Sequence, residues 1–239
     1  AHNLAAENPH MLKELQRQFL SECVKYNVLP LDDRRIERFD PKLAGRPTLI
    51  KGTTQLLFSG MGRLTENTVL NIKNRSHAVT AEVVLPAGPV NGVIVAQGGE
   101  FGGGAPYARA GKLKYCYKPF GLQRFYTESN EPLPAGLHQV RMEFAYAGGG
   151  LAKGGQVTLF VDGKHVAAGE VAATVPFVFS ADETLDVGHE TGSMVTSDYT
   201  PETSKFSGQI KWIQLDLDPD DPDHFISPEE RLRIAMARQ

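Results

Sequence analysis

The chain has 239 residues, 41% of them hydrophobic, which is enough for one large β domain with an appended element. Its 25 basic and 28 acidic residues give a formal net charge of -3, so we expect no nucleic-acid partner. No apolar run approaches the roughly 20 residues that cross a bilayer, and no charged leader precedes an apolar block. We therefore expect a soluble protein without a membrane partner, and the sequence leaves open whether it is cytoplasmic or periplasmic.

The first expected element is an amphipathic helix over residues 9–26. Asn8 is suited to cap its start, and Pro9 fits the first helical position. An apolar stripe then recurs at helical spacing through Leu12, Leu15, Phe19, Cys23 and Tyr26. The stripe must bury against the following domain or against a domain that this chain does not contain. Because the chain begins without Met and enters the helix at once, we expect it to be either a trimmed chain or a piece of a longer polypeptide.

Residues 27–54 combine prolines and glycines with many charges, which predicts an extended linker with little regular structure. From about residue 55 the hydrophobic pattern alternates instead. Roughly ten short strands separated by Gly/Pro-rich turns follow, and this pattern is typical of a β-sandwich or jelly roll. The segments with the clearest strand pattern are 79–85, 93–95, 113–117, 125–127, 138–146, 155–171, 176–180 and 208–217.

A β-hairpin over residues 155–171 is the clearest single prediction. Apolar residues alternate along its first arm, and Asp162-Gly163 supplies the residues that a tight turn needs. A two-residue loop fixes the register of the two arms. The cross-strand pairs that follow are Leu159 with Val166 on the core side and Phe160 with His165 on the outer side.

Two further predictions concern surfaces. The strand over 138–146 alternates apolar residues with polar ones, so we expect its polar face, which carries Gln139 and Arg141, to be wet. Residues 218–239 change sharply in composition and form an acidic turn followed by a short helix that starts with the capping box at 227–230. We expect this helical tail to be a surface appendage.

Local motifs for catalysis or metal binding are absent. The sequence has no Gly-x-Ser-x-Gly, Walker, His-Glu-x-x-His or Cys-x-x-Cys pattern, and its 7 histidines form no cluster. Cys23 and Cys116 are expected to be buried free thiols. The glycine-rich segments 98–105 and 148–155 predict turns rather than phosphate-binding loops, because no helix pattern follows either of them. We therefore assign no catalytic and no cofactor-binding residue.

The acidic segment 181–199 is the best candidate for a ligand-binding loop. Its oxygen-rich side chains lie close to glycines that permit tight turns, and carboxylates suit calcium, although the EF-hand spacing is absent. The alternative is a solvated connection between strands. The candidate ligand-binding residues are Asp182, Asp186, His189, Glu190, Asp198 and Tyr199.

Exposed aromatic side chains on a concave face would instead favour sugar binding. The sequence offers several aromatic residues for that role, and we expect most of them to lie in the core or in cross-strand pairs. These residues are Tyr115, Tyr117, Phe125, Tyr126 and Trp212.

Ten stretches, in order over about residues 3–217, resemble the C-terminal region of large bacterial arylsulfatases, members of the alkaline-phosphatase-like sulfatase group. They are NLAAENPHMLKELQ, KYNVLPLDDR, ERFDPKLAGRPTLI, NIKNRS, GVIVAQGGEFGG, GKLKYCY, PLPAGLHQVRMEF, GGLAKGGQVTLFVDGK, TVPFVFSADETLDVGHETG and GQIKWIQLDL. The resemblance implies that residues 1–54 are the end of a catalytic domain with its linker and that 55–217 form a concanavalin-like accessory sandwich. The tail, 218–239, lies beyond it.

The family's nucleophile is a formylglycine made from the Cys or Ser of a Cys/Ser-x-Pro-x-Arg motif, and it works beside a calcium ion. The sequences that follow Cys23, Cys116 and Ser227 do not match this motif, so no catalytic residue is carried over and this chain holds no cofactor of its own. The small, irregular segment 104–110 also departs from the family and predicts no regular strand.

Three functions follow as hypotheses. The first is the non-catalytic C-terminal portion of an arylsulfatase-like sulfuric ester hydrolase, with the catalytic domain as partner and a role in shaping substrate access. The alternative is a stand-alone lectin-like module that binds carbohydrate or calcium. A structural or dimerising domain is the third, and it requires the stripe at Leu12, Leu15 and Phe19 to be exposed in a monomer.

Overall fold

The structure is a computed structural model that describes residues 2–34, 45, 49–180, 182–219 and 223–237. The chain divides into two compact units, residues 1–38 and 39–239. Described residues of the first unit contain one helix, and those of the second contain twelve strands, a 3-10 turn and a C-terminal helix. The prediction of a mainly β fold with a helix near each end is confirmed.

Helix α1, Pro9–Lys25, forms the first unit as predicted. Pro9 begins it, but the Asn8 side chain donates to the Leu4 carbonyl instead of capping the helix. Cys23 is the single buried residue of the helix, while the other residues of the predicted stripe are exposed. Leu12, Leu15 and Phe19 are 38%, 54% and 52% exposed.

In the predicted linker, 27–54, the described residues 27–34, 45 and 49–53 contain no helix or strand, Thr54 begins the first strand, and 35–44 and 46–48 lie outside the described part of the chain. Neither helix, in the residues that the structure describes, has the length and apolar character needed to span a bilayer.

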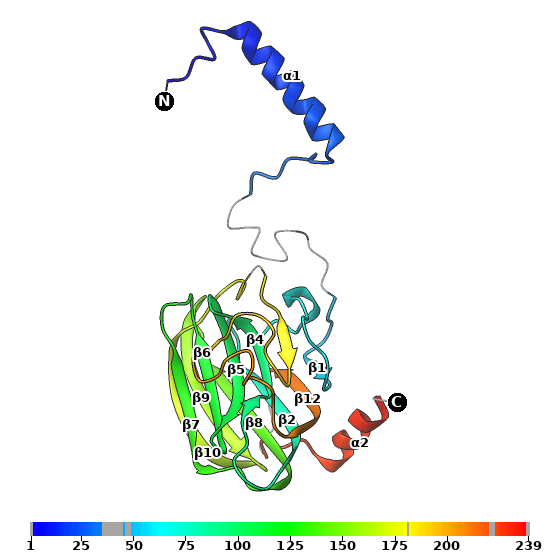
Figure 1. Cartoon of the computed structure of the whole chain (residues 1–239), viewed down its shortest axis with the longest axis vertical. Helices are drawn as coiled ribbons and strands as arrows, with labels where there is room; N and C mark the ends of the chain where they lie inside the picture. Colours follow the sequence, from blue (N-terminus) through cyan, green and yellow to red (C-terminus); the bar gives the residue numbers. More distant parts are fainter. Residues whose placement is uncertain (1, 35–44, 46–48, 181, 220–222, 238–239) are drawn as a thin grey trace. The chain divides into compact units, whose positions relative to one another are not determined.

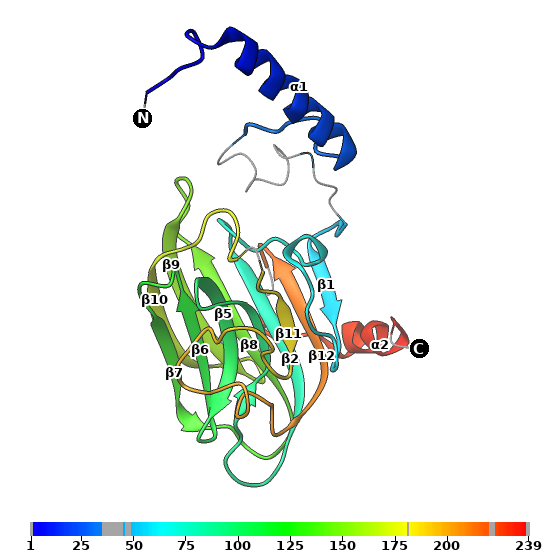
Figure 2. The same cartoon turned by 45° about the horizontal axis from the view of Figure 1, so that its top comes forward.

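Two antiparallel sheets form the second unit (Figures 1 and 2). The first sheet contains, in spatial order, β1 (Thr54–Leu57), β12 (Gln209–Leu217), β2 (His77–Leu85), β8 (Gly136–Tyr146), β9 (Lys153–Val161) and β10 (Lys164–Ala173). The second sheet contains β11 (Leu185–Val187), β4 (Val95–Gly99), β5 (Gly102–Arg109), β6 (Lys112–Lys118) and β7 (Phe125–Pro132), with β3 (Gly92–Val93) paired to β5. The 3-10 turn η2 is Glu66–Thr68. Several neighbouring strands are distant in sequence, so crossovers join the sheets into one sandwich.

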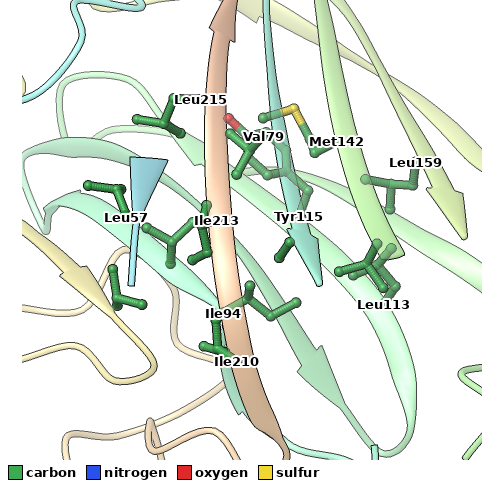
Figure 3. Packing of buried hydrophobic residues seen from close by; sticks show 14 of the residues in the cluster. Leu57, Val79, Ile94, Leu113, Tyr115, Met142, Leu159, Ile210, Ile213 and Leu215 are labelled. Carbon is green, nitrogen blue, oxygen red and sulfur yellow. The ribbon is translucent and has the colours of Figure 1, made fainter. Parts of the chain in front are cut away.

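The core lies between the sheets and collects the alternate residues of each strand (Figure 3). On β2, Val79 and Val83 point inward, as predicted from the alternation. Ile213 and Leu215 of β12 lie beside them, and Met142 of β8 completes this row. Each of these side chains is at most 6% exposed, and burying one contributes on the order of 2 kcal/mol.

The hairpin of β9 and β10 follows the prediction with one exception. Asp162 and Gly163 have φ of 48° and 75°, the pair of left-handed residues that a tight hairpin turn requires. Phe160 pairs with His165 as predicted. Leu159, however, pairs with Ala167 rather than Val166, because the register shifts between His165 and Ala167. A bulge places one extra residue in the second arm.

Two strand predictions were wrong. The segment 104–110 lies largely within β5, because backbone pairing to β4 and β6 holds it. Its small residues are required there, since a methyl group on Gly104 would lie 2.6 Å from the Tyr115 hydroxyl. By contrast, 176–180 is not a strand. Side chains satisfy its backbone instead, with Glu66 accepting from the Phe179 N–H at 3.2 Å.

The predicted C-terminal helix exists as α2, Pro228–Ala237, and Ser227 Oγ accepts from the Glu230 N–H. It is not a surface appendage. Ile226 and Ile234 are 6% and 1% exposed because they pack on Trp212, on the outer face of the first sheet. Both views show α2 beside β12 (Figures 1 and 2).

The same packing corrects the predicted wet face of β8. Gln139 and Arg141 are only 4% and 2% exposed. The Gln139 side chain accepts from the Ile226 N–H at 2.9 Å and donates to the Ile226 carbonyl at 3.0 Å. His224 Nδ1 lies 2.8 Å from Glu143 Oε1. Polar residues on this strand face therefore bind the C-terminal segment rather than water.

Candidate functional site

The acidic segment 181–199 folds over the outer face of the second sheet. Val195 and Tyr199 of the segment join a buried cluster with outward-facing strand residues that include Tyr107 and Cys116. Both cysteines of the chain are buried free thiols, as predicted. Burial raises the pKa of the Cys116 thiol to about 11, so it is unreactive at neutral pH. The segment is therefore a packed cover on the sheet and not a solvated connection.

The carboxylate of Asp186 accepts hydrogen bonds from nearby backbone N–H groups and a hydroxyl group. It lies in β11 and is 2% exposed. Oδ1 accepts from the Arg63 N–H at 2.6 Å, and Oδ2 accepts from both the N–H and the hydroxyl of Thr191, at 2.9 and 2.7 Å. Three donors leave little capacity for an external ligand.

Glu190 is a buried carboxyl group. Its Oε1 accepts from the Val195 N–H at 3.0 Å, and burial raises its pKa to about 7 although the nearby Tyr199 hydroxyl lowers it. Glu190 Oε2 and the Tyr199 hydroxyl are buried without a well-aligned hydrogen bond in the described residues. Burial and Glu190 together raise the pKa of Tyr199. The pair is thus predominantly neutral below pH 7.

Asp198 forms ion pairs with residues of the strands beneath it. Its Oδ2 accepts from the Tyr107 hydroxyl and lies near Lys114 Nζ, each at 2.6 Å, and Oδ1 lies 2.9 Å from Arg109 Nη1. Burial alone would raise the pKa of Asp198, but Lys114 and Tyr107 outweigh it and hold the pKa below its usual value. Glu128 also pairs with Lys114, at 3.0 Å. These contacts fasten the segment to β5 and β6.

The remaining predicted site residues, Asp182 and His189, are exposed. Glu190 and Tyr199 lie together, and Asp198 connects to them through the edge-on contact of Tyr107 with Tyr199, 5.4 Å between ring centres. No group of three or more His, Cys, Asp or Glu side chains in the described ranges is placed to hold a metal ion. The carboxylates already bind protein donors and cations, so they do not fit calcium, and ligand binding by this set stays a prediction.

A second group of residues, absent from the sequence prediction, borders the segment. We call Glu100, Lys118 and Arg124 the Glu100 cluster. It joins the β4–β5 turn to the β6–β7 turn. The two turns are adjacent, as shown by the 3.1 Å that would separate a methyl group on Gly121 from the Glu100 carbonyl oxygen. Ser193 Oγ accepts from the Glu100 N–H at 2.8 Å, so the acidic segment holds this turn in place.

The cluster places two cations on one carboxylate. Lys118 Nζ lies 2.5 Å from Glu100 Oε1, and Arg124 Nη2 lies 3.4 Å from Glu100 Oε2. The first contact is an ion pair without the alignment of a hydrogen bond. The sequence of β6 indicates cations on one face of the sheet, because strand alternation places Lys112, Lys114 and Lys118 together on the outer face.

Exposed apolar side chains surround the cluster. On the two adjoining turns, Phe101, Phe120 and Leu122 are 70%, 54% and 90% exposed, and Tyr126 of β7 is 42% exposed. Of the aromatics considered for sugar binding, Tyr126 is the exposed one. Tyr115, Tyr117 and Trp212 are buried, and Phe125 is partly buried.

No protein-family model matches the sequence, and no curated protein matches it. Several solved structures match the chain at low identity. The mouse laminin alpha1 chain, domains LG4-5, is 13% identical with a TM-score of 0.41, and the match covers 70% of this chain and 39% of that one. The Ruminococcus gnavus IT-sialidase CBM40 is 12% identical with a TM-score of 0.45, over 79% of this chain and 99% of that one.

The SAP-like pentraxin from Limulus polyphemus is 13% identical with a TM-score of 0.35, over 69% of this chain and 73% of that one. This chain spans about two fifths of the laminin structure. At these identities and TM-scores the matches assign no function to the chain. The second unit is a β-sandwich of two antiparallel sheets, the fold class predicted from its sequence.

Proposed function

We propose that this chain is the non-catalytic C-terminal portion of an arylsulfatase-like sulfuric ester hydrolase, in which the sandwich is an accessory domain. The exposed apolar stripe of α1 carries this proposal. Leu15, Phe19 and Leu20 are each more than half exposed, and a contiguous apolar face of this kind marks an interface. The ten stretches that resemble the arylsulfatases support the catalytic domain as the partner in this proposal.

The reactive groups would then belong to that domain. The family's formylglycine and calcium have no counterpart here, because Cys23 and Cys116 lack the required motif and the acidic segment's carboxylates bind protein groups. What this chain supplies is a rigid sandwich with a loop edge at 100–101, 119–124 and 181–199. That edge is where the accessory domain could shape substrate access.

Charge substitution on the stripe tests the docking. Leu15→Asp and Phe19→Asp, made in the polypeptide that includes the catalytic domain, should lower its melting temperature and its aryl sulfate turnover. Arg17→Asp lies on the opposite side of the same helix and is the matched control. Equal effects of Arg17→Asp and Phe19→Asp, or no effect of either, would count against the proposal.

The second candidate is a stand-alone lectin-like module. The observation that favours it is the set of exposed rings at one edge of the sandwich, Phe101, Phe120 and Tyr126, since aromatic faces stack on sugars. Calorimetry of the whole chain with neutral sugars, sulfated sugars and calcium tests it. Absence of heat at high micromolar concentrations would contradict it.

A dimerising domain is the third reading, and the exposed stripe of α1 meets its condition. Sedimentation of the chain separates it from the first. A dimer that Phe19→Asp dissociates supports self-association, whereas a monomer leaves the stripe available to a catalytic domain.

A further inference from the structure

We propose that the Glu100 cluster is a binding site for an oxyanion carried on a ring, namely a sulfate ester or carboxylate on a sugar or aryl compound. In the free chain the carboxylate of Glu100 occupies the site, and the ligand replaces it. This inference deepens the second candidate function, on whose ring binding it rests, by assigning the charge of the ligand and the residues that bind it.

Lys118 is the central cation of the site. It lies at the end of β6 on the outer face of the second sheet, and its side chain is only 1% exposed. A buried ammonium requires an anion beside it, because burial of an unpaired charge is costly. Among the described residues, Glu100 is its one ion-pair partner.

Arg124 supplies unused hydrogen-bond donors next to that ammonium. Its contact to Glu100 is long, 3.4 Å, and its Nε is buried without a hydrogen-bond partner in the described ranges. A guanidinium presents five donors in a plane that matches the geometry of sulfate and carboxylate oxygens. The cluster therefore has an excess of one positive charge and a donor surface that Glu100 does not fill.

Glu100 is placed so that a ligand can displace its side chain without unfolding the chain. The residue lies in the two-residue turn between β4 and β5, and its side chain is 52% exposed. Its backbone stays fixed by Ser193. The neighbouring carboxylate, Glu183, accepts from the Ser193 N–H and hydroxyl at 3.1 and 2.6 Å, so it is held away from the two cations.

The exposed rings define the rest of the ligand. Phe101 and Phe120 extend from the two turns that meet at the cluster. Tyr126 follows Arg124 by two residues along the chain, and a 2.9 Å hydrogen bond joins its hydroxyl to Thr196 Oγ1. Rings in such positions stack on a sugar or aryl plane. An inorganic anion would pair with the cations but leave the exposed rings without a contact. A ring that bears the anion would contact both the cations and the exposed rings.

The test is calorimetry of the whole chain with 4-nitrophenyl sulfate, glucose 6-sulfate, glucuronate and glucose. We expect the anionic compounds to bind about tenfold or more tightly than glucose, and to weaken as salt is added. The ratio between glucose 6-sulfate and glucuronate tells which oxyanion the site prefers.

Two variants locate the binding. Arg124→Gln should weaken glucose 6-sulfate about fivefold or more, and Glu100→Gln should strengthen it by a similar factor because the internal competitor loses its charge. Glu131→Gln removes one negative charge from an exposed residue, so it should leave binding unchanged. Emission from Trp212, the chain's single tryptophan, confirms that each variant is folded.

Equal affinity for glucose and glucose 6-sulfate would overturn the assignment of charge while leaving ring binding intact. Absence of binding by all four compounds would overturn both. Unchanged or weaker binding by Glu100→Gln would overturn the exchange of the internal carboxylate for the ligand.

Discussion

At the scale of the residue, the acidic segment shows that the partners a carboxylate meets in the fold determine whether it is free to bind a ligand. Asp186 and Asp198 bind donors or cations from distant parts of the chain, and Glu190 accepts from the Val195 N–H of its own loop. A sequence displays the carboxylates but not those partners. This is why the composition of the segment indicated a metal or ligand site, while the structure shows a cover fastened to a sheet.

Glu190 gives a prediction about pH. Its pKa is about 7 in the folded chain against 4.5 as the ordinary value, and burial is the main cause. The folded state therefore holds a proton that the unfolded state has released, so this contribution to stability is complete below pH 4.5 and is lost as the pH rises through 7. The effect is on the order of 3 kcal/mol at most.

Glu190→Gln imitates the protonated acid at every pH. Urea unfolding should show the variant near wild type at pH 5 and more stable than wild type at pH 8, by about 1 to 3 kcal/mol. Glu131→Gln, an exposed residue, should shift neither curve. A constant difference between Glu190→Gln and wild type at both pH values would show that Glu190 does not titrate as described.

At the scale of the element, the alternating pattern predicted most of the sheet. Its successes are the long strands β2, β8, β9 and β12, where one face is continuously apolar. It failed for β5, whose glycines and Pro106 lack β propensity but are held by strands on both sides. It also failed at 176–180, where side chains from Glu66 and Asn74 take the place of a strand partner.

The hairpin turn yields a prediction with an internal control. Gly163 has φ of 75°, and a methyl group there would lie 2.8 Å from the Asp223 carbonyl oxygen. Gly149 has φ of 73° but nothing within 4 Å of such a methyl group. Gly163→Ala should therefore cost more than Gly149→Ala, about 2 kcal/mol against about 1 kcal/mol by urea unfolding. Equal costs would mean that the contact with Asp223 is without consequence.

The C-terminal helix was predicted as an element but its packing was not. Ile234 of the helix and Ile226, which precedes it, are buried, whereas Leu232 and Met236 are 63% and 66% exposed. The outer face of β8 is polar, so its alternating pattern did not predict that the C-terminal segment covers it. Side-chain hydrogen bonds from Gln139 to Ile226 join the two.

Truncation of the Ile234 side chain tests the packing of α2 on Trp212. Ile234→Ala should lower the free energy of unfolding by about 2 to 4 kcal/mol and shift the emission of Trp212 to longer wavelength as its ring gains water. Leu232→Ala, on the exposed side of the same helix, is the matched control and should change neither. An unshifted emission in Ile234→Ala would contradict the packing of α2 on Trp212.

At the scale of the whole molecule, the chain consists of a β-sandwich and a helical unit that precedes it in the sequence. The sandwich holds Asp186, Glu190 and Asp198 in internal contacts, whereas exposed rings border the Glu100 cluster. The helix leaves its apolar stripe open. Both features fit the proposal that this chain serves a larger enzyme, and the choice of an arylsulfatase-like hydrolase as that enzyme rests on the resemblance in ten stretches.

Turnover of 4-nitrophenyl sulfate tests most directly the proposal that this chain is the non-catalytic portion of an arylsulfatase-like hydrolase. The purified 239-residue chain should leave the ester intact, whereas the full polypeptide translated from the uninterrupted reading frame that contains it should release sulfate and nitrophenol. Hydrolysis by the 239-residue chain alone, or its absence in the full polypeptide, would contradict the account.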